Sequence, residues 1–303
     1  MSELRFDDRV AVVTGGGRGV GRGHALLLAA RGARVVVADH GGGIDGAGSS
    51  SAPAEEVAAE IRAAGGVAVA CHASVADEDG AASIVAAAID TYGRLDIVVN
   101  NAGIHDAALF SDLTTPQFQR MLDVHFFGAL FVTRAAWPHF VRAGYGRVVN
   151  TVSEAMLGGI PELSSYGSAK GAVFGLTRNL ATEGADAGIT VNAVAPRAYT
   201  RMSASHSDKL AALMGMPKAV MDQINASMPP ELCAPAMAFL AHESCPLNGE
   251  VLQAGMGSVA RIAVVYAQGI NGTSISPEDI ATNLDQVMDL SGAIASATAA
   301  IAH

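Results

Sequence analysis

A serine, a tyrosine and a lysine in the middle of the chain have the types and the spacing of an acid–base site. Lys170 follows Tyr166 by four residues, so a helix that begins near the tyrosine would place both side chains on one face. A neighbouring ammonium favours the phenolate, which predicts a Tyr166 pKa below the ordinary value of about 10 and a usable acid or base near neutral pH. Ser153 ends an apolar run, thirteen residues before Tyr166, from where its hydroxyl could reach the phenol.

The Tyr-x-x-x-Lys spacing alone is weak evidence, because any helix can carry it. The chain contains only three lysines and five tyrosines, however, so few such pairs can arise by chance. The first forty residues provide independent support for a functional role of this pair.

Those first forty residues predict a dinucleotide-binding unit. An apolar strand is expected over 9–14 and a second over 33–38, with a helix over 22–31 between them. The turn at 14–21, Thr-Gly-Gly-Gly-Arg-Gly-Val-Gly, would let backbone approach a pyrophosphate at the helix N-terminus. Asp39 follows the second strand; it would bind both adenosine ribose hydroxyls and repel a 2′-phosphate, which favours NAD over NADP. The alternative, an ordinary tight loop, does not account for these flanking elements.

Strand and helix patterns alternate along the remaining chain. Further strands are expected over 67–71, 95–99, 146–152, 189–195 and 250–253, and helices over 54–64, 77–92, 114–125, 126–143 and 231–241, with one more after Tyr166. This order is typical of the α/β class: a doubly wound parallel sheet of the Rossmann type, with helix layers on both faces. The sequence predicts one domain over 1–258 and a C-terminal extension over 259–303, in which 277–290 is helix-like.

Three other segments carry expectations about ligands and partners. Residues 41–53 are rich in glycine and serine and predict a flexible surface insertion. Residues 197–230 hold five of the eleven methionines, which fits either a lid over an apolar substrate or a helical pair packed by methionine. The helix over 126–143 is apolar on more than one face, and we therefore expect a homodimer or homotetramer.

Composition narrows the function classes. A net charge of −10 makes nucleic acid and anionic membranes poor partners, so a small-molecule substrate is expected. The three cysteines, Cys71, Cys233 and Cys245, lack metal-ligand spacing; we expect no metal and a reducing, cytoplasmic location. The polar N-terminus leads directly into a strand and arginines interrupt the longest apolar runs, so neither a signal peptide nor a membrane span is expected.

Together these motifs resemble the short-chain dehydrogenase/reductase family over roughly residues 5–258. The residues that carry the resemblance are the turn at 14–21, Asp39, the Asn-Asn-Ala-Gly run at 100–103, Ser153, Tyr166 and Lys170. More narrowly, the chain is similar to the (3R)-hydroxyacyl-CoA dehydrogenase part of peroxisomal multifunctional enzyme type 2 and to its bacterial relatives. The closer likeness rests on the glycine-rich insertion after Asp39 and on residues 124–125, 133–137, 198–202 and 242–245.

The resemblance implies a role for each matching residue. Tyr166 would be the general acid or base, Lys170 would lower its pKa and hold the nicotinamide ribose, and Ser153 would hydrogen-bond the substrate oxygen. His125 stands where most of the wider family has asparagine, and is either a proton-relay group or a buried structural histidine. The implied cofactor-binding residues are Gly15, Arg18, Gly19, Val20, Gly21, Asp39, Ser74, Val75, Asn101, Ala102, Gly103, Tyr166, Lys170 and Pro196.

Two further departures from the family pattern affect the cofactor site. The acid that usually contacts adenine is absent from Ala73-Ser74-Val75, so that contact would pass to Ser74, Val75 or backbone. Arg197 follows Pro196 where glycine is usual, and could narrow or charge the nicotinamide entrance.

The sequence therefore predicts an NAD-dependent oxidoreductase that interconverts a secondary alcohol and a ketone, with a (3R)-hydroxyacyl-CoA as the leading substrate class. An NAD(P)-linked dehydrogenase or reductase of a free ketone, alcohol or steroid is the alternative among enzymes. A dinucleotide-sensing protein without catalysis is the alternative outside enzymes, although a sensor would have no need of Ser153, Tyr166 and Lys170.

Overall fold

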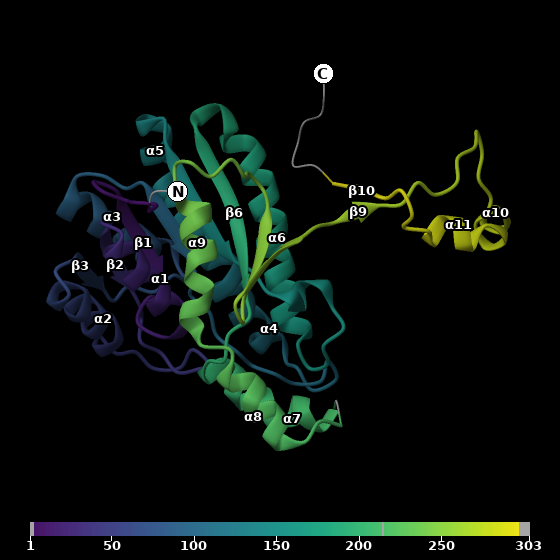
Figure 1. The fold of residues 1–303 in the computed structure, drawn as a ribbon, viewed down its shortest axis with the longest axis horizontal. Coiled ribbons are helices and arrows are strands. Elements are labelled where there is room, and N and C mark those ends of the chain that lie inside the picture. The colour runs from purple at the N-terminus through teal and green to yellow at the C-terminus, as the bar shows by residue number, and fades with distance from the viewer. Residues whose placement is uncertain (1–2, 214, 297–303) are drawn as a thin grey trace.

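The computed structural model describes residues 3–213 and 215–296 as a three-layer α/β/α fold followed by a projecting arm (Figure 1). The main strands are β1 Val10–Thr14, β2 Arg34–Ala38, β3 Val67–Cys71, β4 Ile97–Asn100, β5 Gly146–Thr151, β6 Ile189–Pro196, β7 Val251–Gly255 and β8 Ser258–Ile262. The main helices are α1 Gly19–Ala30, α2 Ala52–Ala63, α3 Glu78–Tyr92, α4 Thr115–Leu122, α5 Gly128–Ala143, α6 Ser164–Gly184, α7 Arg201–Leu213, α8 Lys218–Ala226 and α9 Ala234–Ala241. Four short helices complete the body: the π-helix η1 Asp123–Phe127, and the 3₁₀-helices η2 Glu154–Leu157, η3 Ala185–Ala187 and η4 Pro230–Cys233.

The sheet has the strand order β3-β2-β1-β4-β5-β6-β7-β8, parallel except for β8. The direction of winding reverses between β1 and β4, and ligands of such sheets bind at this point, outside the carboxyl ends of the strands. The predicted doubly wound, Rossmann-type sheet is confirmed.

Burial on both faces of the sheet explains the apolar first strand. Ala11 and Val13 belong to a core cluster shared with α1, α2 and α9, whereas Val10 and Val12 belong to a cluster shared with α3 and α5. All four side chains are fully buried. Successive side chains of a strand point to opposite faces of the sheet, and here helices cover both faces. Both sets of side chains must therefore be apolar, which explains the continuous apolar run in the sequence.

The sheet continues further than the sequence predicted. The last expected strand ended at residue 253, whereas β8 begins at Ser258, the last residue of the expected domain, and runs beside β7 into the expected extension. The two residues between the strands, Met256 and Gly257, both have positive φ, at 54° and 72°. Two such residues make a tight hairpin turn that matches strand twist, and this fixes the antiparallel return.

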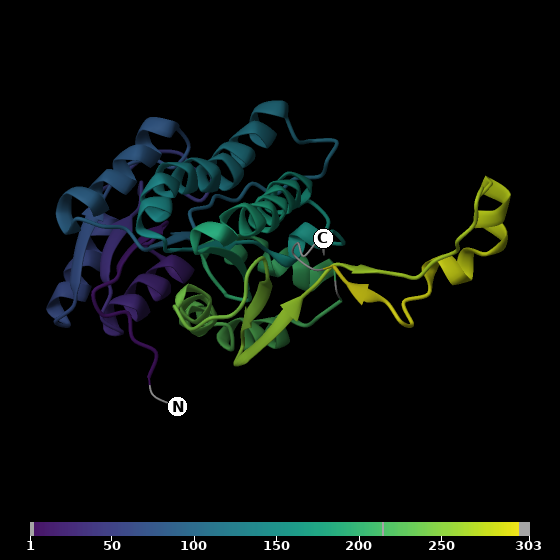
Figure 2. The same cartoon turned by 90° about the horizontal axis from the view of Figure 1, so that it is seen from above.

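Beyond the sheet, the C-terminal segment extends away from the body (Figures 1 and 2). It contains β9 Val265–Tyr266, α10 Pro277–Thr282, α11 Leu284–Met288 and β10 Ile294–Ala295, with β9 and β10 antiparallel. The single helix-like span expected over 277–290 is thus two short helices that meet at Asn283, and Ser276 caps the first through a reciprocal bond with Asp279.

The methionine-rich segment forms the helical pair α7 and α8, which projects from the body beside the carboxyl edge of the sheet (Figure 1). The Tyr199 N–H donates to the Met228 carbonyl at 2.7 Å and so closes the base of the segment. Met221 is buried; Met214 lies outside the described residues.

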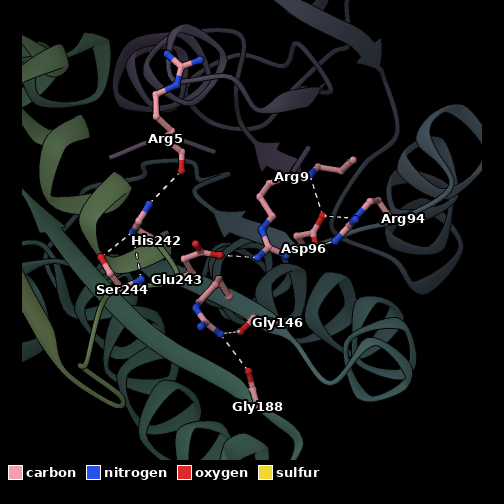
Figure 3. Close-up of polar contacts among 11 residues, drawn as sticks. Arg5, Arg9, Arg94, Asp96, Gly146, Gly188, His242, Glu243 and Ser244 are labelled. Carbon is pink, nitrogen blue, oxygen red and sulfur yellow. Dashed lines mark hydrogen bonds and ion pairs between the residues drawn. The ribbon is translucent and has the colours of Figure 1, made fainter. Parts of the chain in front are cut away.

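The opposite, amino-terminal edge of the sheet is held by a charged cluster (Figure 3). Asp96, only 1% exposed, lies just before β4. Its carboxylate accepts hydrogen bonds from the Val10 N–H at 2.9 Å, Arg94 Nη2 at 2.6 Å and Arg9 Nη1 at 3.2 Å. The contact with Val10 joins the starts of β1 and β4, the two strands on either side of the winding reversal.

Candidate active site

The carboxyl edge of the sheet brings together the serine, tyrosine and lysine singled out from the sequence. Ser153 follows β5 and caps η2, where its hydroxyl accepts the Ala155 N–H at 3.2 Å. Tyr166 and Lys170 lie one turn apart in the first part of α6. The Lys170 ammonium nitrogen donates to the Thr151 carbonyl at 2.6 Å and lies 5.7 Å from the centroid of the Tyr166 ring.

The electrostatic balance at the tyrosine differs from the sequence prediction. Burial raises the pKa of Tyr166, and hydrogen bonding with Ser153 opposes that rise. The expected lowering by Lys170 is therefore wrong for this structure, because Lys170 is buried and directed to Thr151. Burial also lowers the pKa of Lys170 to about 7, so its charge is marginal at neutral pH.

His125 occupies the π-helix η1, between α4 and α5, and contacts the tyrosine. Its ring lies edge-on to Tyr166, with centroids 5.2 Å apart and planes at 85°. Nε2 lies 2.8 Å from the Ile104 carbonyl oxygen and 3.2 Å from the Ile104 backbone nitrogen. Burial, with Lys170 nearby, holds the pKa of His125 well below its usual range, so the imidazole is neutral. The sequence predicted two separate helices here; the π-turn that joins them gives no sequence signal.

A small cavity of about 10 Å³ connects these groups beneath the site. Its lining includes Asn100, His125, Thr151 and Lys170. Asn100 Oδ1, His125 Nδ1 and Thr151 Oγ1 are buried and have no hydrogen-bond partner among the described residues. A cavity of this size and polarity matches one water molecule.

The glycine turn has the shape of a phosphate cradle. Gly15 and Gly19 have positive φ, at 61° and 52°. A Cβ on Gly21 would lie 2.1 Å from the Gly15 carbonyl, and one on Gly15 would lie 2.8 Å from the Ala102 Cα. The turn therefore packs directly against the end of β4 and leads Gly19 and Val20 into the first turn of α1. Close backbone and a free helix N-terminus fit a pyrophosphate.

Asp39 lies at the end of β2, beside this turn. Its carboxylate accepts the Gly17 N–H at 2.9 Å and the Gly41 N–H at 2.8 Å. Arg18 reaches over the same segment and donates to the Gly42 carbonyl at 3.2 Å. The carboxylate is thus fixed beside the glycine turn.

Residues 101–103, which follow β4, support the glycine turn more than they line it. The Asn101 side chain donates to the carbonyls of Thr14 and Gly15 at 3.1 and 3.2 Å, which ties β4 to the turn. Gly103 lies against the His125 ring, where a Cβ would be 2.5 Å from Cε1. The remaining predicted residues are also near: Val75 and Ala102 line the small cavity, while Ser74 accepts the Ala76 N–H in its own turn.

Arg197, directly after Pro196, makes a contact that the sequence did not predict. Its guanidinium donates two hydrogen bonds to Glu154, at 3.0 and 2.9 Å, joining the end of β6 to the residue after Ser153. The Glu154 carboxylate offsets the positive charge of Arg197. The two residues lie 43 positions apart, and no local spacing could have indicated the pair.

Residues 3–213 and 215–296 contain no cluster of three or more histidine, cysteine or carboxylate side chains suited to a metal ion. None of the described helices is long and apolar enough to cross a membrane.

Comparisons with known proteins agree with this geometry. A family model described as short chain dehydrogenase matches residues 9–211. A short-chain type dehydrogenase/reductase of Mycobacterium tuberculosis is 44% identical over 287 residues, covering 94% of this chain and 96% of that protein. The peroxisomal multifunctional enzyme type 2 of Mus musculus is 37% identical over 296 residues, which is 96% of this chain and 38% of that enzyme.

A solved structure extends the likeness to a complex with a cofactor. The 7α-hydroxysteroid dehydrogenase complexed with NADH and 7-oxo glycochenodeoxycholic acid matches with a TM-score of 0.72 at 28% identity, covering 85% of this chain and 98% of that one. The extent of these matches shows that the chain belongs to the short-chain dehydrogenase/reductase family of nicotinamide-dependent oxidoreductases.

Proposed function

We propose that this protein is an NAD-dependent dehydrogenase that interconverts a secondary alcohol and a ketone, with a (3R)-hydroxyacyl-CoA as its substrate class. The observation that carries the proposal is the placement of Ser153, Tyr166 and Lys170 at the carboxyl edge of the sheet, beside the glycine cradle and Asp39. A binding protein would need only the cradle and the acid. The thioester class is supported by the similarity to multifunctional enzyme type 2, of which this chain spans 38%.

In the proposed reaction, bound NAD supplies the hydride acceptor. The Tyr166 phenolate takes the proton of the substrate hydroxyl, and the Ser153 hydroxyl donates a hydrogen bond to the same oxygen as its charge changes. Lys170 would hold the nicotinamide ribose, and His125 would either pass protons or support the Tyr166 ring. Arg18, Gly15, Gly19, Val20, Gly21, Asn101, Ala102, Gly103, Ser74, Val75 and Pro196 would complete the cofactor site.

The segment α7–α8 would act as the substrate lid. Its base carries Thr200, which faces the glycine turn: a Cβ on Gly19 would lie 3.5 Å from Thr200 Cγ2. The hydrogen bond between Tyr199 and Met228 provides a narrow base about which the helical pair could move. We further propose a homodimer or homotetramer located in the cytoplasm.

The substrate class is tested by comparing 3-hydroxyacyl-CoA thioesters with the matching free hydroxy acids, secondary alcohols and hydroxysteroids, with NADH formation as the readout. We expect the thioester to be turned over at least tenfold better than its unconjugated counterpart. Equal or better use of the free alcohol or steroid would favour the alternative supported by the hydroxysteroid dehydrogenase structure. Binding of NAD without turnover of any substrate would favour a sensor.

Cofactor preference should depend on Asp39. Replacement by alanine, Asp39→Ala, removes the charge that would repel a 2′-phosphate, and we expect the ratio of kcat/KM for NADP to that for NAD to rise at least tenfold. Asp45→Ala is the matched control because Asp45 is exposed and its carboxylate accepts the Ala47 N–H within its own turn. An unchanged ratio in Asp39→Ala would remove this carboxylate from cofactor selection.

The desolvation of the half-buried Tyr166 phenol predicts how the reaction depends on pH. Burial raises the pKa of Tyr166, so the phenolate that accepts a proton becomes available only as pH rises into the alkaline range. Alcohol oxidation, measured as kcat/KM, should therefore increase with pH, while ketone reduction, which needs the protonated phenol, should decrease above that pKa. Ser153→Ala removes the hydrogen bond that opposes the shift and should move both profiles to higher pH; an unmoved profile would contradict this account.

A further inference from the structure

A second histidine, His105, contacts the Tyr166 ring from a loop outside the catalytic group. The centroids of the two rings are 5.8 Å apart and their planes meet at 90°. His125 makes the same kind of edge contact with the same ring. Perpendicular arrangements at this separation are favoured between aromatic rings, so two edge contacts together restrict the orientation of the phenol.

The glycine-rich segment 41–50 fixes the position of His105. The His105 backbone N–H donates to the Ile44 carbonyl at 2.8 Å, and Gly46 lies against Ile104, where a Cβ would be 3.2 Å from Cγ2. The segment is itself closed by backbone hydrogen bonds, from Ser50 to His40 at 3.0 Å and from Gly43 to Ala47 at 2.8 Å. Residues 41–50, which lie between β2 and α2, thus contact the segment after β4, and we call them the strap.

The residues on either side of His105 are held as well. His125 contacts the Ile104 carbonyl, and the Asp106 carboxylate accepts hydrogen bonds from Gln117 at 3.0 Å and Arg120 at 3.1 Å, both in α4. A loop fixed at three consecutive residues can hold a side chain against its neighbour with little freedom. Such precision matters at a reacting group, because small displacements there cost much of the rate.

We propose that His105 is a positioning residue that holds the Tyr166 ring in its reactive orientation, and that the strap 41–50 acts on catalysis by fixing His105. This inference rests on the proposed dehydrogenase function, in which Tyr166 transfers the proton. It adds a residue that is not among the catalytic and cofactor-binding residues expected from the sequence, and gives the glycine-rich strap a role in catalysis.

The first test compares two replacements of His105. His105→Phe keeps an aromatic edge against Tyr166, whereas His105→Ala removes it. We expect kcat to fall at least fivefold further in His105→Ala than in His105→Phe, with NAD affinity within threefold of the parent in both. A smaller difference between the two variants would overturn the proposal. Should His105→Ala fail to fold, judged by circular dichroism, His105→Leu takes its place because it keeps the bulk without the aromatic edge.

A second readout does not depend on turnover. The titration of Tyr166 can be followed by ultraviolet absorbance, as the difference between each protein and the same protein with Tyr166→Phe. Removal of the His105 ring should expose the phenol and bring its pKa nearer to the ordinary value, whereas His105→Phe should leave the titration in place. If the parent turns over no alcohol, the proposed function fails, and this titration still decides whether His105 holds the phenol.

The strap is tested by joining residue 42 to residue 49, which removes Ile44 and its hydrogen bond to His105 while keeping Asp39 and Gly41. We expect this shortened loop to lower kcat. The variant that combines it with His105→Ala should have a kcat no lower than that of the slower single variant, because both changes act through one contact. If instead the reduction in kcat in the combined variant equalled the product of the two separate reductions, the strap would not act through His105.

Discussion

Tyr166→Phe should reduce turnover by about a thousandfold or more while NAD affinity stays nearly unchanged. The substitution removes only the hydroxyl, and positioned general acid–base groups typically contribute factors of about 10² to 10⁴ in rate. The ring would remain between the edges of His105 and His125, so the surrounding structure should not collapse. Steady-state NADH formation gives the turnover, and quenching of protein fluorescence on titration gives the affinity.

Tyr92→Phe is the matched control for this experiment. Tyr92 ends α3, away from the site, and its buried hydroxyl has no hydrogen-bond partner among the described residues. Loss of that hydroxyl should leave turnover within about twofold of the parent, since no polar partner is orphaned. If Tyr166→Phe retained turnover within tenfold of the parent, the phenol would not be the acid–base group, and the proposed reaction would lose its proton acceptor.

Much of the fold could be predicted because its signals are local. A strand covered on both faces must be apolar throughout, and a turn at 14–21 that approaches other backbone must be glycine-rich. Both constraints are visible in a few consecutive residues. The hairpin from β7 to β8 was missed because its turn is Met256-Gly257, and a methionine at positive φ is not a residue that patterns associate with such turns.

The site was predicted as a set of residues but not as a set of interactions. Tyr166 and Lys170 share a helix face, as their spacing requires, yet burial sets the pKa of both and reverses the expected shift of the phenol. Burial depends on the whole fold and has no signature at four-residue spacing. The same holds for the pair of Glu154 with Arg197 and for the contact of His105 with Tyr166, since each joins segments that meet only when the strands assemble.

The segment 41–50 makes tertiary contacts that its composition does not predict. Glycine and serine predict a mobile loop because they add no apolar surface of their own. The Ile44 backbone carbonyl accepts a hydrogen bond from the His105 N–H, which lies on another loop. A Cβ on Gly41 would lie 2.0 Å from the Ser50 carbonyl oxygen, so glycine permits the backbone to pack closely at this position. Glycine is required here for close approach between segments, and composition alone does not distinguish that use from flexibility.

Loss of the Asp96 carboxylate should reduce the stability of the fold by several kcal/mol, about the cost of breaking a buried charge pair. Its carboxylate is almost wholly buried and accepts hydrogen bonds from Arg9, Arg94 and the Val10 N–H. Asp96→Asn keeps the shape but replaces one acceptor oxygen by a donor that faces other donors. Breaking a buried, hydrogen-bonded charge pair costs about 3–5 kcal/mol; because Arg94 is 47% exposed and can regain water, we expect about 3 kcal/mol.

Urea denaturation measures this loss as a lower midpoint at unchanged slope. Asp8→Asn is the control, since Asp8 pairs with Arg34 on the same edge of the sheet but its side chain is 85% exposed, and its replacement should leave the midpoint almost unchanged. A shift of less than about 1 kcal/mol in Asp96→Asn would mean that water reaches the arginines freely once the carboxylate is gone. We expect a larger loss of unfolding free energy for Asp96→Asn than for Asp8→Asn because Asp96 joins β4 to β1. The site at the other end of these two strands depends on their register.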